Sequence, residues 1–253
     1  TLFRSYATTI NVALNASTYK IIHGENTGDT EYFKKGFASD EEREAYEAEL
    51  CATVEAEGAA LLKNENNALP LASGAKVSLF GHGSVDLMYG GTGSGSVDTS
   101  KAPNLKQALE AQGITINQTL WDLYSSDSMM SKYSRLTPAS ISDTLEANTQ
   151  YAVNEAPWSA LSSAESRFAE YGDAAIVVLS RSGGEGADLP SGENGTNDSW
   201  ISGQEGDGNY LALSAEEIEL LQNLKALKDN GTFKKIVVLI NSSNAIELEI
   251  GRA

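Results

Sequence analysis

The sequence predicts an α/β fold in which an open, mostly parallel sheet carries helices on both faces, making a three-layer α/β sandwich. Two continuous apolar runs, at residues 174–179 and 236–240, are typical of strands that a parallel sheet buries on both faces. Helical patterns alternate along the chain with these runs and with a shorter apolar run at residues 76–80. This alternation of strands and helices is the sequence pattern of α/β proteins.

The first predicted region, residues 1–38, is an irregular N-terminal extension, and residues 39–253 form the sandwich domain. The extension is weakly patterned and contains a long polar stretch. A helix begins after Ser39, which makes a capping box with Glu42, and it continues to about residue 62. Apolar residues recur along this helix at helical spacing, namely Tyr46, Leu50, Val54 and Leu61.

The next elements are a strand, a glycine-rich loop and a helix. The strand covers residues 76–80 and leads directly into the loop at 81–98. The helix begins at Asn104, a favourable N-cap, and ends at Gly113, a favourable stop.

The middle of the chain combines short strands with a polar excursion. Residues 114–120 are expected to form a strand, and residues 121–167, which are mostly polar, an irregular or helical excursion. The buried strand at 174–180 follows, and a second loop rich in glycine, serine and asparagine occupies 182–209.

The clearest helix of the sequence begins after Ser214, which makes a capping box with Glu217, and stops at Gly231. The residues expected to face the core are Ile218, Leu221, Leu224 and Leu227. Another buried strand is expected within residues 234–248.

Composition excludes some classes of function. Of the 253 residues, 41% are hydrophobic, which is enough for a sizeable core. The formal net charge of −17 and the scattered lysines and arginines argue against nucleic-acid binding. The single cysteine, Cys51, cannot form an intramolecular disulfide and is expected to pack in the core among its apolar neighbours.

Both glycine-rich loops follow predicted strands, and ligands of parallel sheets bind beyond the carboxyl ends of the strands. The two loops are therefore candidates to share one site. The stretch RSGGEGADLP, residues 181–190, places the lone carboxylate of Glu185 between glycines in this crevice, where the backbone lets a ligand approach closely. The alternative is that Glu185 is an ordinary surface carboxylate in a loop.

Nucleotide binding is another interpretation of the first loop. Gly81 and Gly83 lack the third glycine and the directly following helix of a dinucleotide-binding turn, and the later glycines lack the lysine of a phosphate-binding loop. The spacing therefore disfavours a nucleotide.

Metal binding is an interpretation of the second loop. Its carboxylates are those of Glu185, Asp188, Glu193, Asp198, Glu205 and Asp207. Their order fits no calcium-binding loop, and the two histidines, His23 and His82, are too few for zinc with one distant cysteine. His82 is instead expected to line or support its loop.

Five segments in order resemble the α/β sandwich domain of family 3 glycoside hydrolases, the β-glucosidase group. They read EGAALLKNENNALPL, KVSLFGHGSVDLMYGGTGSGSV, DAAIVVLSRSGGEGADL, YLALSAEEIELL and KKIVVLINSSNAIEL, and they span about residues 57–248. The resemblance implies a retaining β-glycosidase in which a barrel domain supplies an aspartate nucleophile and the sandwich supplies the acid/base glutamate. No metal or organic cofactor is implied.

The resemblance implies that Glu185 is the general acid/base. The family's loop reads Ser-Gly-Glu-Gly-x-Asp-Arg, and here both flanking glycines are present and Asp188 matches the aspartate. Gly183 stands where serine is usual, and Leu189 where arginine is usual. Because this loop varies among subgroups, Glu193 and Glu205 remain alternatives for the acid/base.

The resemblance also points to residues that bind substrate, namely Arg181, Asp188, Tyr89, Gly91 and Trp200. Tyr89 and Gly91 lie in the loop that resembles the family's loop near the sugar, and Tyr89 is expected to stack on a pyranose ring. Trp200 is expected to bound an outer subsite. The alternative for the glycine-rich loop is that it only packs a domain interface.

The family's nucleophile segment, an apolar strand ending in Ser-Asp-Trp or Thr-Asp-Trp, is absent from these residues, since LWDLYSSD at 120–127 has a different order. We therefore expect the chain to be inactive alone and to need a barrel domain to hydrolyse a β-glucoside or oligosaccharide. The stretch GDTEYFKKGFASDEE, residues 28–42, resembles the start of the sandwich in members with reversed domain order, and the sandwich is expected to be truncated at its C-terminal end. The alternative is a noncatalytic carbohydrate-binding or structural domain.

Overall fold

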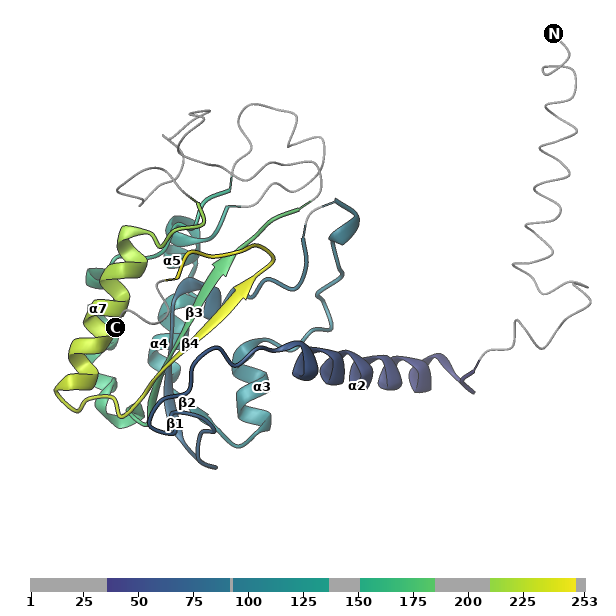
Figure 1. Cartoon of the computed structure of the whole chain (residues 1–253), viewed down its shortest axis with the longest axis horizontal. Coiled ribbons are helices and arrows are strands. Elements are labelled where there is room, and N and C mark those ends of the chain that lie inside the picture. Colours follow the sequence, from purple (N-terminus) through teal and green to yellow (C-terminus); the bar gives the residue numbers. More distant parts are fainter. Residues whose placement is uncertain (1–35, 92, 137–150, 185–209, 249–253) are drawn as a thin grey trace, which may run out of the picture. The chain divides into compact units, whose positions relative to one another are not determined.

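The computed structural model describes residues 36–91, 93–136, 151–184 and 210–248, whose helices and strands are shown in Figure 1. The chain divides into two compact units, Thr1–Leu62 and Lys63–Ala253. The predicted domain boundary between residues 38 and 39 stays a prediction.

The first unit contains helix α2, Asp40–Gly58. The Ser39 hydroxyl accepts a hydrogen bond of 3.2 Å from the Glu42 backbone N–H, which is one half of the predicted capping box, but the Glu42 carboxylate accepts from the Ala38 N–H instead of the Ser39 N–H. Acidic residues in the first turn suit the positive end of the helix dipole. The helix ends at Gly58 rather than near residue 62. No residue of α2 is buried and Cys51 is exposed, so the prediction that Cys51 packs in a core is wrong. A single helix in the described part of this unit has no second layer of its own to pack against.

The second unit is built on a four-stranded parallel sheet in the order β2-β1-β3-β4. The strands are β1 (Lys76–Phe80), β2 (Thr115–Ile116), β3 (Ala174–Arg181) and β4 (Ile236–Ser242). Strand β1 pairs with β3 from Val77 opposite Ala174 to Phe80 opposite Val177, and β4 pairs with β3 from Ala175 onward. Every pairing in the described sheet is parallel, which confirms the predicted sheet.

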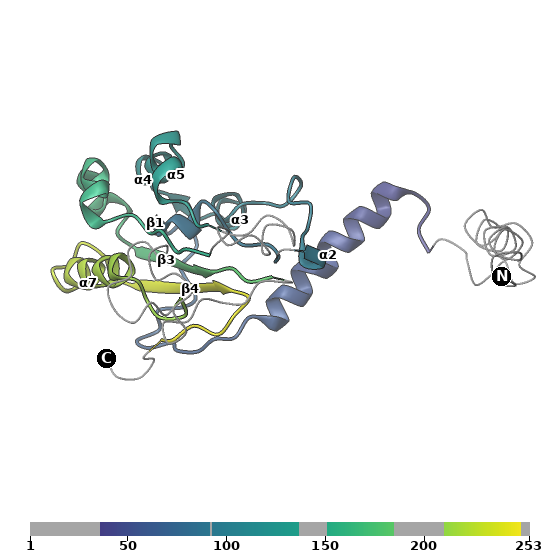
Figure 2. The same cartoon turned by 90° about the horizontal axis from the view of Figure 1, so that it is seen from above.

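Helices lie on both sides of the sheet, as the two views in Figure 1 and Figure 2 show. One face carries α4 (Gln118–Tyr124), α5 (Asp127–Tyr133), the 3-10 helix η3 (Trp158–Arg167) and α7 (Ala215–Asp229), and the other carries α3 (Leu105–Ala111). Shorter 3-10 turns are η1 (His82–Ser84), η2 (Gly93–Gly95) and η4 (Ala169–Tyr171). The three layers confirm the predicted α/β sandwich.

Successive residues of the central strands point to opposite faces and so supply two cores. Val177 of β3 contributes to the core under α4 and α7, and Ile176 to the core under α3. In the first core, the ring of Phe80 packs against Phe168 and Phe233 with centroids 5.2 and 5.7 Å away. Strand β3 is thus buried on both sides, which is why its residues 174–179 are continuously apolar.

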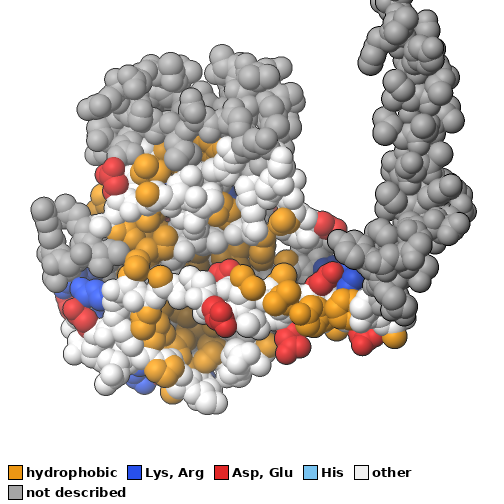
Figure 3. Space-filling view, turned by 45° about the vertical axis from the view of Figure 1, so that its right-hand side comes forward, with side chains coloured by type: hydrophobic (Ala, Val, Ile, Leu, Met, Phe, Trp, Pro, Cys, Tyr) orange, Lys and Arg blue, Asp and Glu red, His pale blue; other side chains and the backbone are white. Residues whose placement is uncertain are grey.

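Two predicted strands differ from the structure. Strand β2 ends at Ile116 because the Asn117 side chain accepts a hydrogen bond from the Leu120 N–H and starts α4 there, so the predicted strand at 117–120 is wrong. Strand β4 forms where expected, but Leu239 is 37% exposed because β4 lies at an edge of the described sheet. Figure 3 shows hydrophobic side chains at the surface of the described parts.

Helix α7 confirms its predicted capping box, in which Ser214 and Glu217 bond reciprocally. Its buried side is centred on Leu220 and Leu224, whereas Ile218, expected in the core, is 42% exposed. In the part of the chain that the structure describes, no helix combines the length and apolar character of a membrane span.

Candidate active site

The strand order places a crevice at the carboxyl ends of β1 and β3. From β1 the chain crosses to β2 on one side, and it later returns to form β3 on the other side, so the direction of winding reverses between these two neighbours. Open α/β sheets bind ligands at such a switch point. The two glycine-rich loops of the sequence start here, after Phe80 and after Arg181.

The two loops touch through glycines. A Cβ atom added to Gly91 would lie 2.8 Å from the Gly183 carbonyl oxygen and 3.5 Å from the Cα of Gly184. Such a contact with backbone leaves no room for a side chain at residue 91. The loop after β1 therefore packs directly on the start of the loop after β3, two residues before Glu185.

A pocket of about 340 Å³ opens beside this contact. Its walls include Asp86, Tyr89, Gly91, Val97, Arg135 and Ser182. Of the predicted substrate-binding residues, the structure thus brings Tyr89 and Gly91 to one pocket.

Tyr89 lies in the pocket wall with its hydroxyl already bonded within the protein. Its hydroxyl donates a hydrogen bond of 2.9 Å to the Pro103 carbonyl oxygen, while the residue remains 41% exposed at the pocket. Partial burial raises the pKa of Tyr89, and the nearby Asp86 carboxylate adds a smaller effect in the same direction. The hydroxyl therefore stays protonated and keeps its role as a donor.

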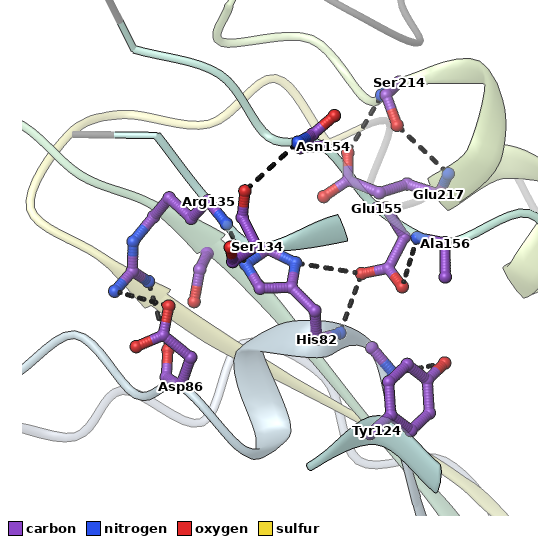
Figure 4. A network of polar contacts seen from close by, with 12 residues as sticks. His82, Asp86, Tyr124, Ser134, Arg135, Asn154, Glu155, Ala156, Ser214 and Glu217 are labelled. Atoms are coloured by element: carbon purple, nitrogen blue, oxygen red, sulfur yellow. Dashed lines mark hydrogen bonds and ion pairs between the residues drawn. The ribbon is translucent and has the colours of Figure 1, made fainter. Parts of the chain in front are cut away.

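An ion pair that sequence reasoning missed lies in the same pocket. Arg135 Nη2 is 3.2 Å from Asp86 Oδ2, and Arg135 Nη1 donates to the Asp86 backbone carbonyl at 3.2 Å (Figure 4). Asp86 is visible in the motif of the first loop, but its partner lies 49 residues away in a polar stretch. Only the packing of that stretch on the loop reveals the pair.

The turn that begins the first loop is held by a buried histidine and glutamate. The His82 backbone N–H donates to Glu155 Oε2 at 2.9 Å, and His82 Nδ1 lies 3.4 Å from the same oxygen. His82 Nε2 accepts a hydrogen bond of 3.2 Å from the Arg135 backbone N–H, which places the ring proton on Nδ1, facing Glu155. His82 therefore supports the loop from within, and Figure 4 shows its link to Arg135.

Gly81 makes the sharp turn at the end of β1. It has a φ of 82°, and a Cβ there would lie 2.6 Å from the Val178 carbonyl oxygen. Its N–H donates to the Tyr124 hydroxyl at 3.1 Å. Burial, together with the Glu155 carboxylate, raises the pKa of Tyr124 well above its ordinary value, so this hydroxyl is neutral.

The end of β4 fixes the middle of the first loop. The Asn241 side chain accepts a hydrogen bond from the Met88 N–H at 2.6 Å and donates to the Met88 carbonyl at 3.0 Å. Ser180 of β3 donates its hydroxyl to the same Asn241 oxygen at 3.2 Å. Loop and sheet are thus joined one residue before Tyr89.

Arg181 was expected to contact substrate, and its surroundings are incompatible with that role. It is fully buried, and each of its five N–H donors is engaged. Nε donates to Tyr210 O, Nη1 to Ser180 O and Glu217 Oε1, and Nη2 to Ala212 O and Glu217 Oε2, all within 2.6–2.8 Å. No donor is left for a ligand.

The other predicted site residues, Glu185, Asp188, Trp200, Glu193 and Glu205, lie outside the described residues. Gly183, which replaces the usual serine of the resembled motif, is described. A Cβ there would lie 2.6 Å from both polar atoms of the Asn244 amide group, whose nitrogen donates to Ser182 O at 3.0 Å. The Asn244 amide thus fills the space that a serine side chain would need.

Among the described residues, no three His, Cys, Asp or Glu side chains are placed so that they could hold one metal ion. The carboxylate-rich stretch of the second loop falls within residues 185–209, which are not among those described.

Comparison with known proteins identifies a family. The family model of the glycosyl hydrolase family 3 C-terminal domain matches residues 59–252. Beta-glucosidase A of Butyrivibrio fibrisolvens is 35% identical over 146 residues, which cover 55% of this chain and 15% of that protein. The chain therefore spans about 15% of the length of this curated relative.

Solved structures share the fold. A β-glucosidase from Paenibacillus barengoltzii is similar with a TM-score of 0.55 and 24% identity, over 79% of this chain and 19% of that one. Beta-glucosidase 3B from Thermotoga neapolitana, in complex with glucose, is similar with a TM-score of 0.58 and 24% identity, over 82% and 26% of the two chains. Since the family model covers most of the second unit, the chain belongs to the family of glycosyl hydrolase family 3 C-terminal domains.

Proposed function

We propose that this chain is the sandwich part of a retaining β-glycosidase of the β-glucosidase type, and that Glu185 is its general acid/base. The contact between Gly91 and Gly183 carries the proposal, because it joins the start of the Glu185 loop to the pocket loop at the switch point of the sheet. Membership of the family supplies the class of reaction.

The chemistry requires two carboxyl groups about 5–5.5 Å apart. In the first step, Glu185 donates its proton to the glycosidic oxygen as the leaving group departs, while the second carboxylate attacks the anomeric carbon. In the second step, the Glu185 carboxylate removes a proton from water as the water displaces that second carboxylate. Glu185 thus ends protonated again and the sugar retains its configuration.

The second carboxylate is proposed to be an aspartate of a barrel domain outside these 253 residues. The barrel is proposed to follow the sandwich, as in family members with reversed domain order. The small share of the curated relative that the chain covers supports a larger parent protein. The nucleophile segment of the family has no match here, so the chain alone is proposed to be inert.

The pocket suits the edge of a sugar. Tyr89 offers an aromatic face, and Asp86, oriented by Arg135, offers a carboxylate to a hydroxyl group. Asp188 and Trp200 stay proposals as further substrate contacts. The substrate proposed is a terminal β-linked sugar of a glucoside or oligosaccharide.

The test is aryl β-glucoside hydrolysis by the parent protein with Glu185→Ala. We expect a loss of about 10²-fold or more with poor leaving groups and a smaller loss with dinitrophenyl glucoside, which departs without a proton. Added azide is expected to restore turnover and to yield a glycosyl azide of retained configuration, since a small anion can enter where the carboxylate was.

Glu193→Ala and Glu205→Ala are matched controls in the same loop and are expected to lack both effects. If one of them shows the azide product instead, the acid/base role moves to that residue. If the parent protein has no hydrolytic activity but binds sugars, the chain is a noncatalytic carbohydrate-binding domain.

A further inference from the structure

The two ends of the segment that carries Glu185 are tied together by a buried group of four residues, Arg181, Ser182, Tyr210 and Glu217, which we call the Arg181 clamp. Arg181 is the last residue of β3 and Ser182 follows it, and Tyr210 is the first described residue after the segment. Glu217 lies in the first turn of α7. All four are at most 2% exposed.

Arg181 joins the end of β3 to the returning chain. Its Nε donates to the Tyr210 carbonyl at 2.7 Å and its Nη2 to the Ala212 carbonyl at 2.6 Å. Its guanidinium carbon also lies 5.7 Å from the centre of the Tyr210 ring. One side chain therefore fixes two carbonyl groups, those of Tyr210 and Ala212, where the chain re-enters the fold.

Tyr210 makes the reverse connection. Its hydroxyl accepts a hydrogen bond of 2.9 Å from the Ser182 N–H and donates one of 3.1 Å to the Ser182 carbonyl. Burial raises the pKa of Tyr210, so the hydroxyl stays neutral and makes both bonds. The Ser182 carbonyl accepts a further bond from Asn244 after β4, so it is held from two sides.

Glu217 anchors this arrangement to α7. Its Oε2 accepts from Arg181 Nη2 at 2.7 Å and from the Ser214 N–H at 2.9 Å, and its Oε1 accepts from Arg181 Nη1 at 2.8 Å. The carboxylate that caps the helix is thus also the partner of the buried arginine. Two parallel bonds between planar groups fix direction as well as distance.

A buried ion pair contributes little net stability compared with apolar packing, because desolvation offsets its attraction. A role in geometry is therefore the better explanation for a pair whose donors are all used within the protein. We propose that Arg181 and Glu217 are positioning residues that set where the Glu185 segment leaves β3 and where it rejoins the fold. The catalytic consequence rests on the proposed function of Glu185.

The first experiment tests the clamp in this 253-residue chain by amide hydrogen exchange. Tyr210→Phe removes only the hydroxyl, and Glu217→Gln keeps the shape while replacing one acceptor by a donor. Both are expected to speed exchange of the Ser182 amide by about tenfold or more, because a buried hydrogen bond is lost. The β1 amides are expected to change less than about twofold, which separates local opening from unfolding.

Asp229→Asn is the matched control, since it breaks an exposed ion pair with Lys225 on the same helix. It is expected to leave Ser182 exchange unchanged. If the two clamp variants leave the Ser182 amide as protected as in the native chain, or if β1 exchanges equally faster, the clamp does not hold the segment and the proposal is overturned.

The second experiment uses the parent protein and compares leaving groups. With Glu217→Gln, we expect kcat to fall about tenfold more for substrates with poor leaving groups than for dinitrophenyl glucoside. KM is expected to stay nearly unchanged, because the variant displaces only the proton-donating carboxyl group of Glu185. Arg181→Lys is expected to behave alike, since lysine keeps the charge but not the paired bonds.

The two proposals fail in different ways. Suppose that Glu185→Ala shows the leaving-group effect but that Glu217→Gln lowers kcat by the same factor for every substrate. The positioning role is then refuted and the acid/base role stands. If Glu185→Ala lacks the effect, the acid/base assignment is refuted, and the exchange of the Ser182 amide alone decides whether the clamp fixes the segment.

Discussion

At the scale of single residues, backbone contact is what defines the pocket. Gly91 and Gly183 bring two loops together that are far apart in the sequence, and a Cβ atom at Gly91 would meet the Gly183 backbone, whereas one at Gly183 would meet the Asn244 side chain. Glycine at residue 91 is required by the approach of another backbone rather than by loop flexibility. Gly95, in the same loop, has nothing within 4 Å of a Cβ position.

This difference between two glycines is testable. Gly91→Ala is expected to lower the free energy of unfolding by about 1–3 kcal/mol, because the added methyl must displace backbone. Gly95→Ala is the matched control and is expected to change it by less than about 0.5 kcal/mol. Urea unfolding monitored by fluorescence measures both. Equal effects at the two positions would mean that the loops are not in close contact in solution.

The role of Tyr89 in binding is also decided at this scale. Its hydroxyl is committed to Pro103, so a sugar would meet the ring. In the parent protein, Tyr89→Ala is expected to weaken competitive inhibition by glucose about tenfold, and Tyr89→Phe less than about threefold. Identical inhibition constants for the alanine variant and the native protein would remove Tyr89 from the site.

At the scale of elements, local sequence signals located the helices that begin after Ser39, Asn104 and Ser214, but they missed α4, which starts inside a predicted strand. The caps at Asn104 and Ser214 and the glycine stop at Gly113 act within a few residues, so they are legible in the sequence. The buried side of α7 is decided by the neighbours of the helix. Ile218 is exposed for that reason although it fits the apolar pattern.

The amino ends of the strands are joined by an ion pair that predicts a pH dependence. Asp173 accepts from Lys234 Nζ at 2.6 Å and from the Lys76 N–H at 2.8 Å. The bond with Lys234 has the larger effect, and the two bonds together hold the pKa of Asp173 below its ordinary value of about 3.9. Asp173 thus contributes stability above that value, and this contribution is lost as the pH falls through the lower folded-state pKa.

Asp173→Asn is therefore expected to lower stability near pH 7 by less than about 1 kcal/mol, because the pair is largely in water. The difference from the native chain is expected to vanish in acid, once the pH has fallen below the lowered folded-state pKa of Asp173. Urea unfolding across pH measures this, with the exposed Glu165→Gln as control. A difference that stays constant into acid would show that the Asp173 charge is not the cause.

At the scale of the whole molecule, strand order creates the candidate site. The order β2-β1-β3-β4 puts the switch point between β1 and β3, and both glycine-rich loops open there. Residues from the loop after β1, from the polar excursion and from the chain just after β3 then meet around one pocket, and Asn241 of β4 holds Met88 in its wall. A site assembled from so many segments depends on the complete sheet.

The activity of the isolated chain is the prediction at this scale. The purified 253-residue chain is expected to give no turnover of aryl β-glucosides above the rate of buffer, because Glu185, the proposed acid/base, would complete neither step without a nucleophile. A fluorogenic β-glucoside provides the measurement, with the parent protein as positive control. Measurable turnover by the isolated chain would contradict the need for a barrel.

The sequence by itself determined the α/β class, the strands β1 and β3, and the starts of the helices capped at Ser39, Asn104 and Ser214, because periodicity and caps act between near neighbours. The tertiary structure decided which strands are adjacent, and with that the contact between Gly91 and Gly183. It also replaced a substrate-binding role for Arg181 by a buried pair with Glu217, 36 residues away. Such long-range pairing depends on how the sheet brings distant segments together, which no local pattern encodes.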